Sequence, residues 1–123
     1  ETRVQAAFAL SLLTKSCVPC LSNYMRAKEL KFQNKYDGVN TDDFVLTATD
    51  NSNNESKIFA QIKHEITISG SSNSVFAEVI HSAWADFKNV GFKSERDSIA
   101  LITGNLPKTD INNTLPLLEW AKF

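Results

Sequence analysis

Apolar residues recur at helical spacing in two long segments of the chain. Arg3 to Thr14 is apolar almost all round, which predicts a helix buried on most faces, and Pro19 should break or kink it. A second helix should follow a cap at Asn73 or Ser74 and run to about Lys88, because either side chain can accept hydrogen bonds from the first free backbone amides. We expect its apolar stripe to pack in the core. The stripe contains Val75, Phe76, Val79, Ile80, Ala83, Trp84 and Phe87.

Four segments with strand-like composition alternate with polar tracts. They are Lys31 to Tyr36, Phe44 to Thr49, Lys57 to His64 and Asp97 to Thr103. The polar tract from Asp50 to Ser56 separates the second from the third, so these two should pair as an antiparallel hairpin.

Further helical pieces are predicted before the first strand and after the last. A more polar piece is expected from Cys20 to Leu30, and a final helix should begin at Asp110 or Asn112. The order of elements is then αβββαβα. A meander followed by a crossover helix and a further strand predicts an α/β fold, with a mixed sheet of about four strands flanked by helices.

The composition is that of an ordinary globular domain. The chain has 123 residues, of which 42% are hydrophobic and 22% charged, and its formal net charge is −1. This near-neutral charge argues against simple coating of DNA, which depends on neutralising many phosphates, but not against an enzyme that brings a metal ion to the phosphate. No apolar stretch is long enough for a membrane span and no signal peptide is apparent, so a cytoplasmic location is expected.

The two ends of the sequence indicate a piece of a longer protein. It begins at Glu1 without a methionine and ends inside an apolar, helix-like run from Leu115 to Phe123. We therefore interpret residues 1–123 as a single domain excised from a longer multidomain protein.

The two cysteines form a Cys-x-x-Cys motif, a spacing that thiol-disulfide catalysts and half zinc sites share. A catalytic motif should open a helix, whereas Cys17 and Cys20 follow a helical segment. A zinc site would need further ligands, and His64 and His81 lie far along the chain. We favour two partly buried cysteines at a proline-marked helix end over a redox or metal role.

Polar side chains occupy one face of the third predicted strand. Alternation puts Gln61 and Lys63 on the same side. The apolar residues Ile58, Ala60 and Ile62 fall on the other side. An edge strand with one solvent-exposed face would be enough to explain this pattern. However, an acidic pair, Asp42 and Asp43, also stands at the start of the preceding strand.

The order of these features resembles the PD-(D/E)xK nuclease superfamily, and more closely the DNA-endonuclease effector domains at the N-terminus of bacterial antiviral defence proteins. In that branch a first helix carries an aromatic residue followed by Gln, a strand begins with Asp-Asp, and the third strand ends in Gln-Val-Lys-His. The matching segments here are Val4-Gln5, Thr41-Asp42-Asp43-Phe44, Gln61-Ile62-Lys63-His64, Ala83-Trp84-x-x-Phe87 and Ala100-Leu101-Ile102-Thr103. The chain departs from the family at Val4, which replaces the aromatic residue, and at Gln61, which replaces the usual acid.

The resemblance implies a restriction-endonuclease-like three-layer core and a metal-dependent DNA endonuclease, expected to cut double-stranded DNA with Mg²⁺ or Mn²⁺. Phosphodiester hydrolysis needs positive charge at the phosphate and a positioned water. Asp42 and Asp43 point to opposite faces if the strand has already begun, so only one is the main metal ligand. We favour Asp42, with Asp43 as the alternative.

The remaining site residues follow from the same resemblance. Gln61 would offer its amide oxygen to the metal, and the backbone carbonyl of Ile62 would complete the ligand shell. Lys63 would orient the attacking water or stabilise the developing charge. Gln5 and His64 are expected around these ligands, with Gln5 able to contact a phosphate, although a solvent-facing Gln5 and a packed, hydrogen-bonded His64 are the simpler interpretations.

The resemblance also implies linked sensor or oligomerisation domains outside the fragment, and a homo-oligomer as the active form. Two other interpretations stay open. The missing acid at Gln61 and the near-neutral charge favour a catalytically inactive nuclease-fold interaction module, and Cys17 with Cys20 would support a thiol redox domain.

Overall fold

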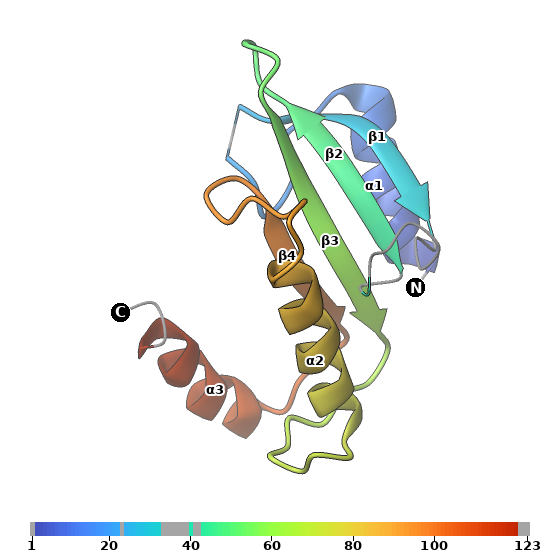
Figure 1. The fold of residues 1–123 in the computed structure, drawn as a ribbon. Coiled ribbons are helices and arrows are strands. Elements are labelled where there is room, and N and C mark those ends of the chain that lie inside the picture. Colours follow the sequence, from blue (N-terminus) through green and yellow to red (C-terminus); the bar gives the residue numbers. More distant parts are fainter. Residues whose placement is uncertain (1, 23, 33–39, 41–42, 121–123) are drawn as a thin grey trace.

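A four-stranded mixed sheet with a helix on each face organises the chain (Figure 1). The computed structural model describes residues 2–22, 24–32, 40 and 43–120. The elements are α1 (Thr2–Thr14), β1 (Arg26–Phe32), β2 (Phe44–Thr49), β3 (Glu55–Lys63), α2 (Val75–Phe87), β4 (Ser98–Thr103) and α3 (Lys108–Trp120). This order confirms the predicted αβββαβα arrangement. No helix in the described ranges is both long and apolar enough to cross a membrane.

The strands lie in the order β1-β2-β3-β4, with β1, β2 and β3 forming an antiparallel meander and β4 parallel to β3. The predicted hairpin of β2 and β3 is confirmed. Its turn is held by Asp50, whose carboxylate accepts hydrogen bonds from the backbone amides of Ser52 and Asn54 and from the Asn54 side chain, at 2.8 to 2.9 Å. Because β4 runs parallel to β3, the intervening α2 must cross over the sheet.

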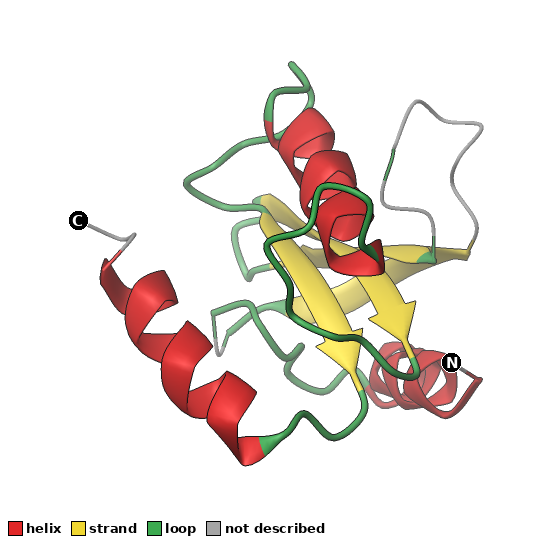
Figure 2. Cartoon of the chain, turned by 90° about the horizontal axis from the view of Figure 1, so that it is seen from below, coloured by secondary structure: helices red, strands yellow, loops and turns green. Residues whose placement is uncertain are grey.

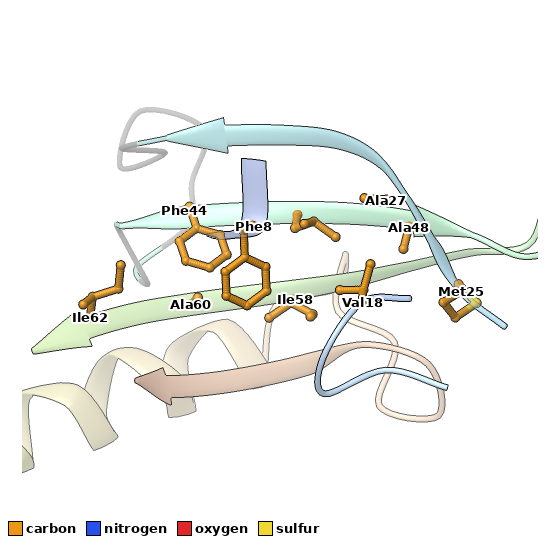
Figure 3. Close-up of a cluster of buried hydrophobic side chains, with 10 residues drawn as sticks. Phe8, Val18, Met25, Ala27, Phe44, Ala48, Ile58, Ala60 and Ile62 are labelled. Atoms are coloured by element: carbon orange, nitrogen blue, oxygen red, sulfur yellow. The ribbon is translucent and has the colours of Figure 1, made fainter. Parts of the chain in front are cut away.

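The main hydrophobic core lies between α1 and the sheet (Figure 3). Phe8 of α1 meets Phe44 of β2 with ring centroids 4.7 Å apart. Ile58, Ala60 and Ile62 of β3 join the same cluster, so the alternation predicted for this strand is confirmed. Burying a side chain such as Ile58 contributes about 2 kcal/mol.

The opposite face of the sheet carries α2, which gives three layers: α1, sheet and α2 (Figure 2). The predicted cap of α2 is confirmed at Ser74, whose hydroxyl accepts from the backbone amide of Ala77 at 3.1 Å. Phe59 of β3 meets Phe92, just beyond α2, at 5.6 Å between ring centroids.

The helix predicted at Cys20 to Leu30 is wrong, because β1 begins at Arg26. A bulge shifts the β1–β2 register between Ala27 and Glu29. Because of this bulge, Ala27 and Leu30 both reach the α1 core although they are three residues apart. A spacing of three residues is also typical of a helix, which explains the wrong prediction. The strand predicted at Lys31 to Tyr36 overlaps the end of β1 at Lys31 and Phe32, and its remainder lies outside the described residues.

Two predictions about burial are wrong. In α1 only Phe8 is buried, and in the apolar stripe of α2 only Val79 is buried. Ile80 is 51% exposed and Trp84 57% exposed. Helical spacing fixes which side chains share a face, but it does not supply a neighbouring element to cover that face.

The last helix also departs from the prediction in where it begins. α3 starts at Lys108, before Asp110. It stands apart from the sheet, and a cavity lies between it, α2 and β4 (Figures 1 and 2). Leu115 and Trp120 of this helix are exposed, at 54% and 71%.

Candidate active site at the ends of β2 and β3

Asp43 stands immediately before β2 and contacts the end of β3. Its Oδ2 accepts a hydrogen bond from the backbone amide of Ile62. Phe44 pairs with Ala60 in the antiparallel register, so Asp43, one residue earlier, lies across from Gln61. This arrangement brings one of the two predicted acids to the strand that carries Gln61 and Lys63. Asp42 lies outside the described residues.

Gln61 and Lys63 share the face of β3 that is turned away from the α1 core. Gln61 is only 9% exposed and lines a cavity beside α2, whereas Lys63 is half-buried. A buried amide and a more accessible ammonium group therefore lie on the same side of the sheet, two residues apart. Their predicted common orientation is confirmed.

Thr103 is a further polar residue at this end of the sheet, and the sequence did not single it out as a site residue. It pairs with Lys63 in the parallel register of β3 and β4. Its Oγ1 is buried and has no hydrogen-bond partner within the part of the chain that the structure describes. Alternation along β4 puts Thr103 on the same face as Leu101, so a threonine in line with apolar residues was the available signal.

A largely apolar cavity of about 520 Å³ opens beside these residues, between α2, β4 and α3. Gln61 and Thr103 are polar members of its wall. Phe76 and Val79 of α2 and Leu115 of α3 are among the apolar ones. The site therefore combines polar groups at the strand ends with a hydrophobic recess next to them.

Gly104 keeps the ends of β3 and β4 close together. Its backbone amide donates to the carbonyl oxygen of Lys63 at 3.4 Å. A Cβ atom at this position would lie 2.5 Å from the carbonyl oxygen of His64, so any other residue would push the two strand ends apart. The neighbourhood of Lys63 and Thr103 thus depends on this glycine.

Asp86 anchors the segment that precedes β2. It is 2% exposed, and its Oδ1 accepts from the backbone amide of Asn40 at 2.7 Å and from the Asn40 side chain at 2.9 Å. The last turn of α2 therefore holds a residue three positions before Asp43. An acid between Trp84 and Phe87 in an apolar stripe was the sequence signal for this role.

A metal ion would find few ligands among the described residues. No group of three or more His, Cys, Asp or Glu side chains converges within them. Asp43 offers one carboxylate, already engaged with Ile62, and Gln61 offers a neutral amide oxygen. Mg²⁺ keeps several waters and needs only one or two carboxylates. The residues fit a weakly held Mg²⁺, and the ligand role of the Ile62 carbonyl stays a prediction.

Gln5 and His64 lie at the margins of this arrangement. Gln5 is half-buried on α1, which packs on the opposite side of the sheet from the Gln61 side chain. His64 is exposed just beyond the end of β3. Their roles around the metal stay predictions.

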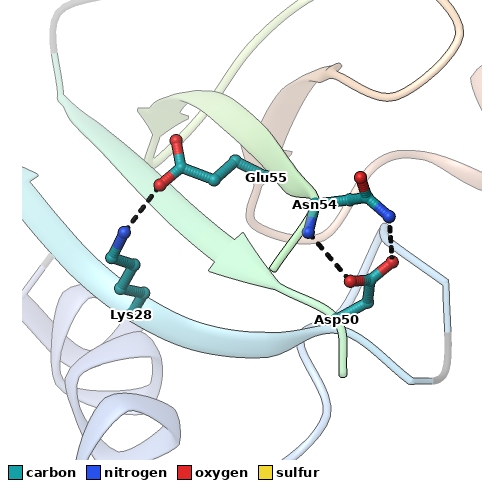
Figure 4. A network of polar contacts seen from close by, with 4 residues as sticks. All are labelled: Lys28, Asp50, Asn54 and Glu55. Atoms are coloured by element: carbon teal, nitrogen blue, oxygen red, sulfur yellow. Dashed lines mark hydrogen bonds and ion pairs between the residues drawn. The ribbon is translucent and has the colours of Figure 1, made fainter. Parts of the chain in front are cut away.

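The charged groups at the other end of the hairpin are tied into polar contacts (Figure 4). The hydrogen bond from the Asn54 side chain is the main cause that lowers the pKa of Asp50 below its ordinary value. Lys28 and Glu55 form an exposed ion pair at 2.6 Å, which raises the pKa of Lys28 and lowers the pKa of Glu55. These contacts stabilise the turn end of the hairpin, which lies at the opposite end of β2 and β3 from Asp43 and Lys63.

The cysteines do not occupy the place expected of a thioredoxin-like motif. Cys17 and Cys20 lie in the connection between α1 and β1, ahead of a strand rather than at the start of a helix. Both are exposed, so the prediction of two partly buried cysteines is wrong. Pro19 begins a turn here, which leads the chain away from α1 with both side chains at the surface.

Comparison with protein-family models, with curated protein sequences and with solved structures finds no match to this chain.

Proposed function

We propose that Asp43, Gln61 and Lys63 form a metal-dependent phosphodiesterase site, and that the chain is a DNA endonuclease. The observation that carries the proposal is the hydrogen bond from the Ile62 amide to Asp43. It fixes a carboxylate beside the backbone segment between Gln61 and Lys63. The carboxylate therefore lies beside the strand segment that also carries the Gln61 amide and the Lys63 ammonium group.

These three groups match the needs of phosphodiester hydrolysis. Asp43, with the Gln61 amide oxygen, would hold Mg²⁺ or Mn²⁺, which would supply positive charge at the scissile phosphate. Lys63, the more exposed of the two β3 residues, would orient the attacking water and stabilise the charge that develops on the phosphate. Asp42 is the further acid that this set would use.

The fold is compatible with the PD-(D/E)xK superfamily that the sequence motifs resemble. The order αβββαβα, the antiparallel meander and the parallel fourth strand form the mixed, helix-flanked sheet expected of a restriction-endonuclease-like core. We infer from the resemblance that the substrate is double-stranded DNA. From the same resemblance we infer a cytoplasmic antiviral effector, which linked sensor domains bring together as a homo-oligomer.

The test is plasmid cleavage by purified protein with and without Mg²⁺. Lys63→Ala should abolish metal-dependent cleavage and leave the circular dichroism spectrum unchanged. Lys57→Ala is the matched control, because Lys57 lies on the same strand and face, also half-buried, but at the other end of β3. Equal cleavage by Lys63→Ala and the parent protein would refute the proposal.

A catalytically inactive interaction module is the second candidate. It is favoured by the neutral amide at Gln61 and by the engagement of Asp43 with the backbone. Calorimetric titration with Mg²⁺ and Mn²⁺ separates the two functions, using Asp43→Asn as the comparison. A catalytic site should bind metal in a way that Asp43→Asn weakens, whereas an inactive module should give no heat that depends on Asp43.

A further inference from the structure

Arg26 holds its guanidinium against the sulfur of Cys17. Nη1 of Arg26 lies 2.7 Å from Cys17 Sγ. The two residues also face each other in an antiparallel backbone bridge, and the amide of Val18 donates to the carbonyl of Met25 at 3.4 Å. Backbone pairing sets the two residues opposite each other, which puts the thiol within reach of the guanidinium although both side chains are exposed.

Cys20 is presented on a constrained turn three residues later. Its φ is 66°, a left-handed value that few residues other than glycine adopt, and Pro19 precedes it as in a type II turn. The hydroxyl of Ser98 donates to the Cys20 carbonyl at 3.2 Å and ties this turn to β4. Cys20 also lines an open cavity of about 540 Å³, walled by polar residues that include Asp97 and Ser98.

Between the two cysteines, Val18 is 2% exposed and belongs to the α1 core. This anchor keeps the motif in place while both thiols remain at the surface. A small reagent can therefore reach both sulfurs without unfolding the chain. Cys17 differs from Cys20 in having a cationic hydrogen-bond donor at its sulfur.

We propose that Cys17 and Cys20 form a redox-responsive dithiol that exchanges with low-molecular-weight disulfides, with Cys17 as the attacking thiol and Cys20 as the resolving thiol. In the first step Cys17 gives up its proton to solvent and attacks one sulfur of the disulfide. A mixed disulfide forms, and one small thiolate leaves and takes a proton from solvent. The guanidinium of Arg26 stabilises the negative charge that Cys17 carries as it attacks.

In the second step Cys20 loses its proton to solvent and attacks Cys17 Sγ. The Cys17–Cys20 bond forms and the second small thiolate is released. Two protein thiols are oxidised and one small disulfide is reduced to two thiols, so electrons and atoms balance. The product closes the connection between α1 and β1 covalently, at the end of β1 that pairs with Thr49 and not with Phe44. The exchange therefore does not depend on the proposed nuclease activity.

The probe is oxidised glutathione added to the purified chain, followed by intact-mass and peptide mass spectrometry. The parent protein should lose the mass of two hydrogen atoms, with the new bond between Cys17 and Cys20. Cys20→Ser should stop at the mixed disulfide on Cys17. Cys17→Ser should react at Cys20 about tenfold more slowly than Cys20→Ser reacts at Cys17, since the sulfur of Cys20 has no charge-assisted hydrogen bond among the described residues.

Arg26→Gln tests the role of the guanidinium. In the Cys20→Ser background it should slow the reaction of Cys17 about tenfold. Lys28→Gln, which removes another exposed cation from β1, is the control and should leave the rate unchanged. Equal rates at Cys17 and Cys20, an unaltered rate in Arg26→Gln, or no bond between the two cysteines in the folded protein would each overturn the proposal.

Discussion

The buried hydroxyl of Thr103 makes a sharp prediction about stability. The change is Thr103→Val, which replaces Oγ1 by a methyl group of nearly the same size. In the unfolded chain the hydroxyl is hydrogen-bonded to water, but in the folded chain Oγ1 is buried and has no partner within the described residues. Folding therefore loses a hydrogen bond at this position without replacing it, and valine avoids that loss.

The size of the gain follows from this geometry. A buried hydroxyl without a partner costs about 1–3 kcal/mol, and we expect Thr103→Val to stabilise the fold by that amount. The entropy of unfolding of a domain of this length is about 0.26 kcal/mol/K. The melting temperature should then rise by about 4–12 °C.

Thermal and urea denaturation of the purified variants measure the effect. Thr47→Val is a matched control, because Thr47 is a threonine on the same face of the sheet and is only 7% exposed. Its hydroxyl, unlike that of Thr103, is not a buried oxygen without a hydrogen-bond partner among the described residues. Its gain should be smaller. An unchanged or lower melting temperature for Thr103→Val would refute the reasoning, because it would mean that water or another group satisfies Oγ1.

Three further predictions concern neighbouring polar groups. Gln61→Glu puts a carboxylate at a position that is only 9% exposed, and it should destabilise the metal-free fold by about 1–3 kcal/mol. Mg²⁺ should restore the melting temperature of this variant. A melting temperature that does not change on adding Mg²⁺ would count against the metal site. Asp50→Asn should reduce stability at neutral pH, because folding lowers the pKa of Asp50. The stabilisation by the Asp50 carboxylate is fully present above its unfolded-state pKa and is lost as the pH falls through its folded-state pKa. The unfolding free energies of both proteins in urea should therefore converge in acid, and a difference that does not depend on pH would contradict this account. Asp86→Ala removes the acceptor of both Asn40 hydrogen bonds and should cost about 2 kcal/mol in urea denaturation, whereas a neutral result would show that the anchor is dispensable.

Strand β3 shows how far periodicity can be carried from sequence to structure. Alternation correctly separated Gln61 and Lys63 from the core residues Ile58 and Ile62, because a side-chain period of two admits only two faces. The Ser74 cap was equally predictable, since its chemistry is local. Both predictions depend on neighbouring residues in the chain and on nothing else.

The features that escaped prediction depend on residues distant in the sequence. The bulge between Ala27 and Glu29 appears only when β1 pairs with β2. The contact of Asp43 with Ile62, and the pairing of Lys63 with Thr103, require the sheet register. Helical spacing puts Trp84 in the apolar stripe of α2, but its 57% exposure depends on which elements pack against that helix. Alternation assigns Thr103 to a face, but only the assembled sheet shows that its hydroxyl has no partner there.

The parallel pairing of β3 with β4 has a consequence for the order in which the chain folds. Asp43 and Gln61 can meet as soon as the short hairpin of β2 and β3 closes, and such local contacts form quickly. Thr103 reaches Lys63 only after the whole crossover through α2 has closed, which costs more chain entropy. The three proposed catalytic residues, Asp43, Gln61 and Lys63, thus belong to the part of the sheet that can form early. Thr103 joins them only when the last strand pairs with β3.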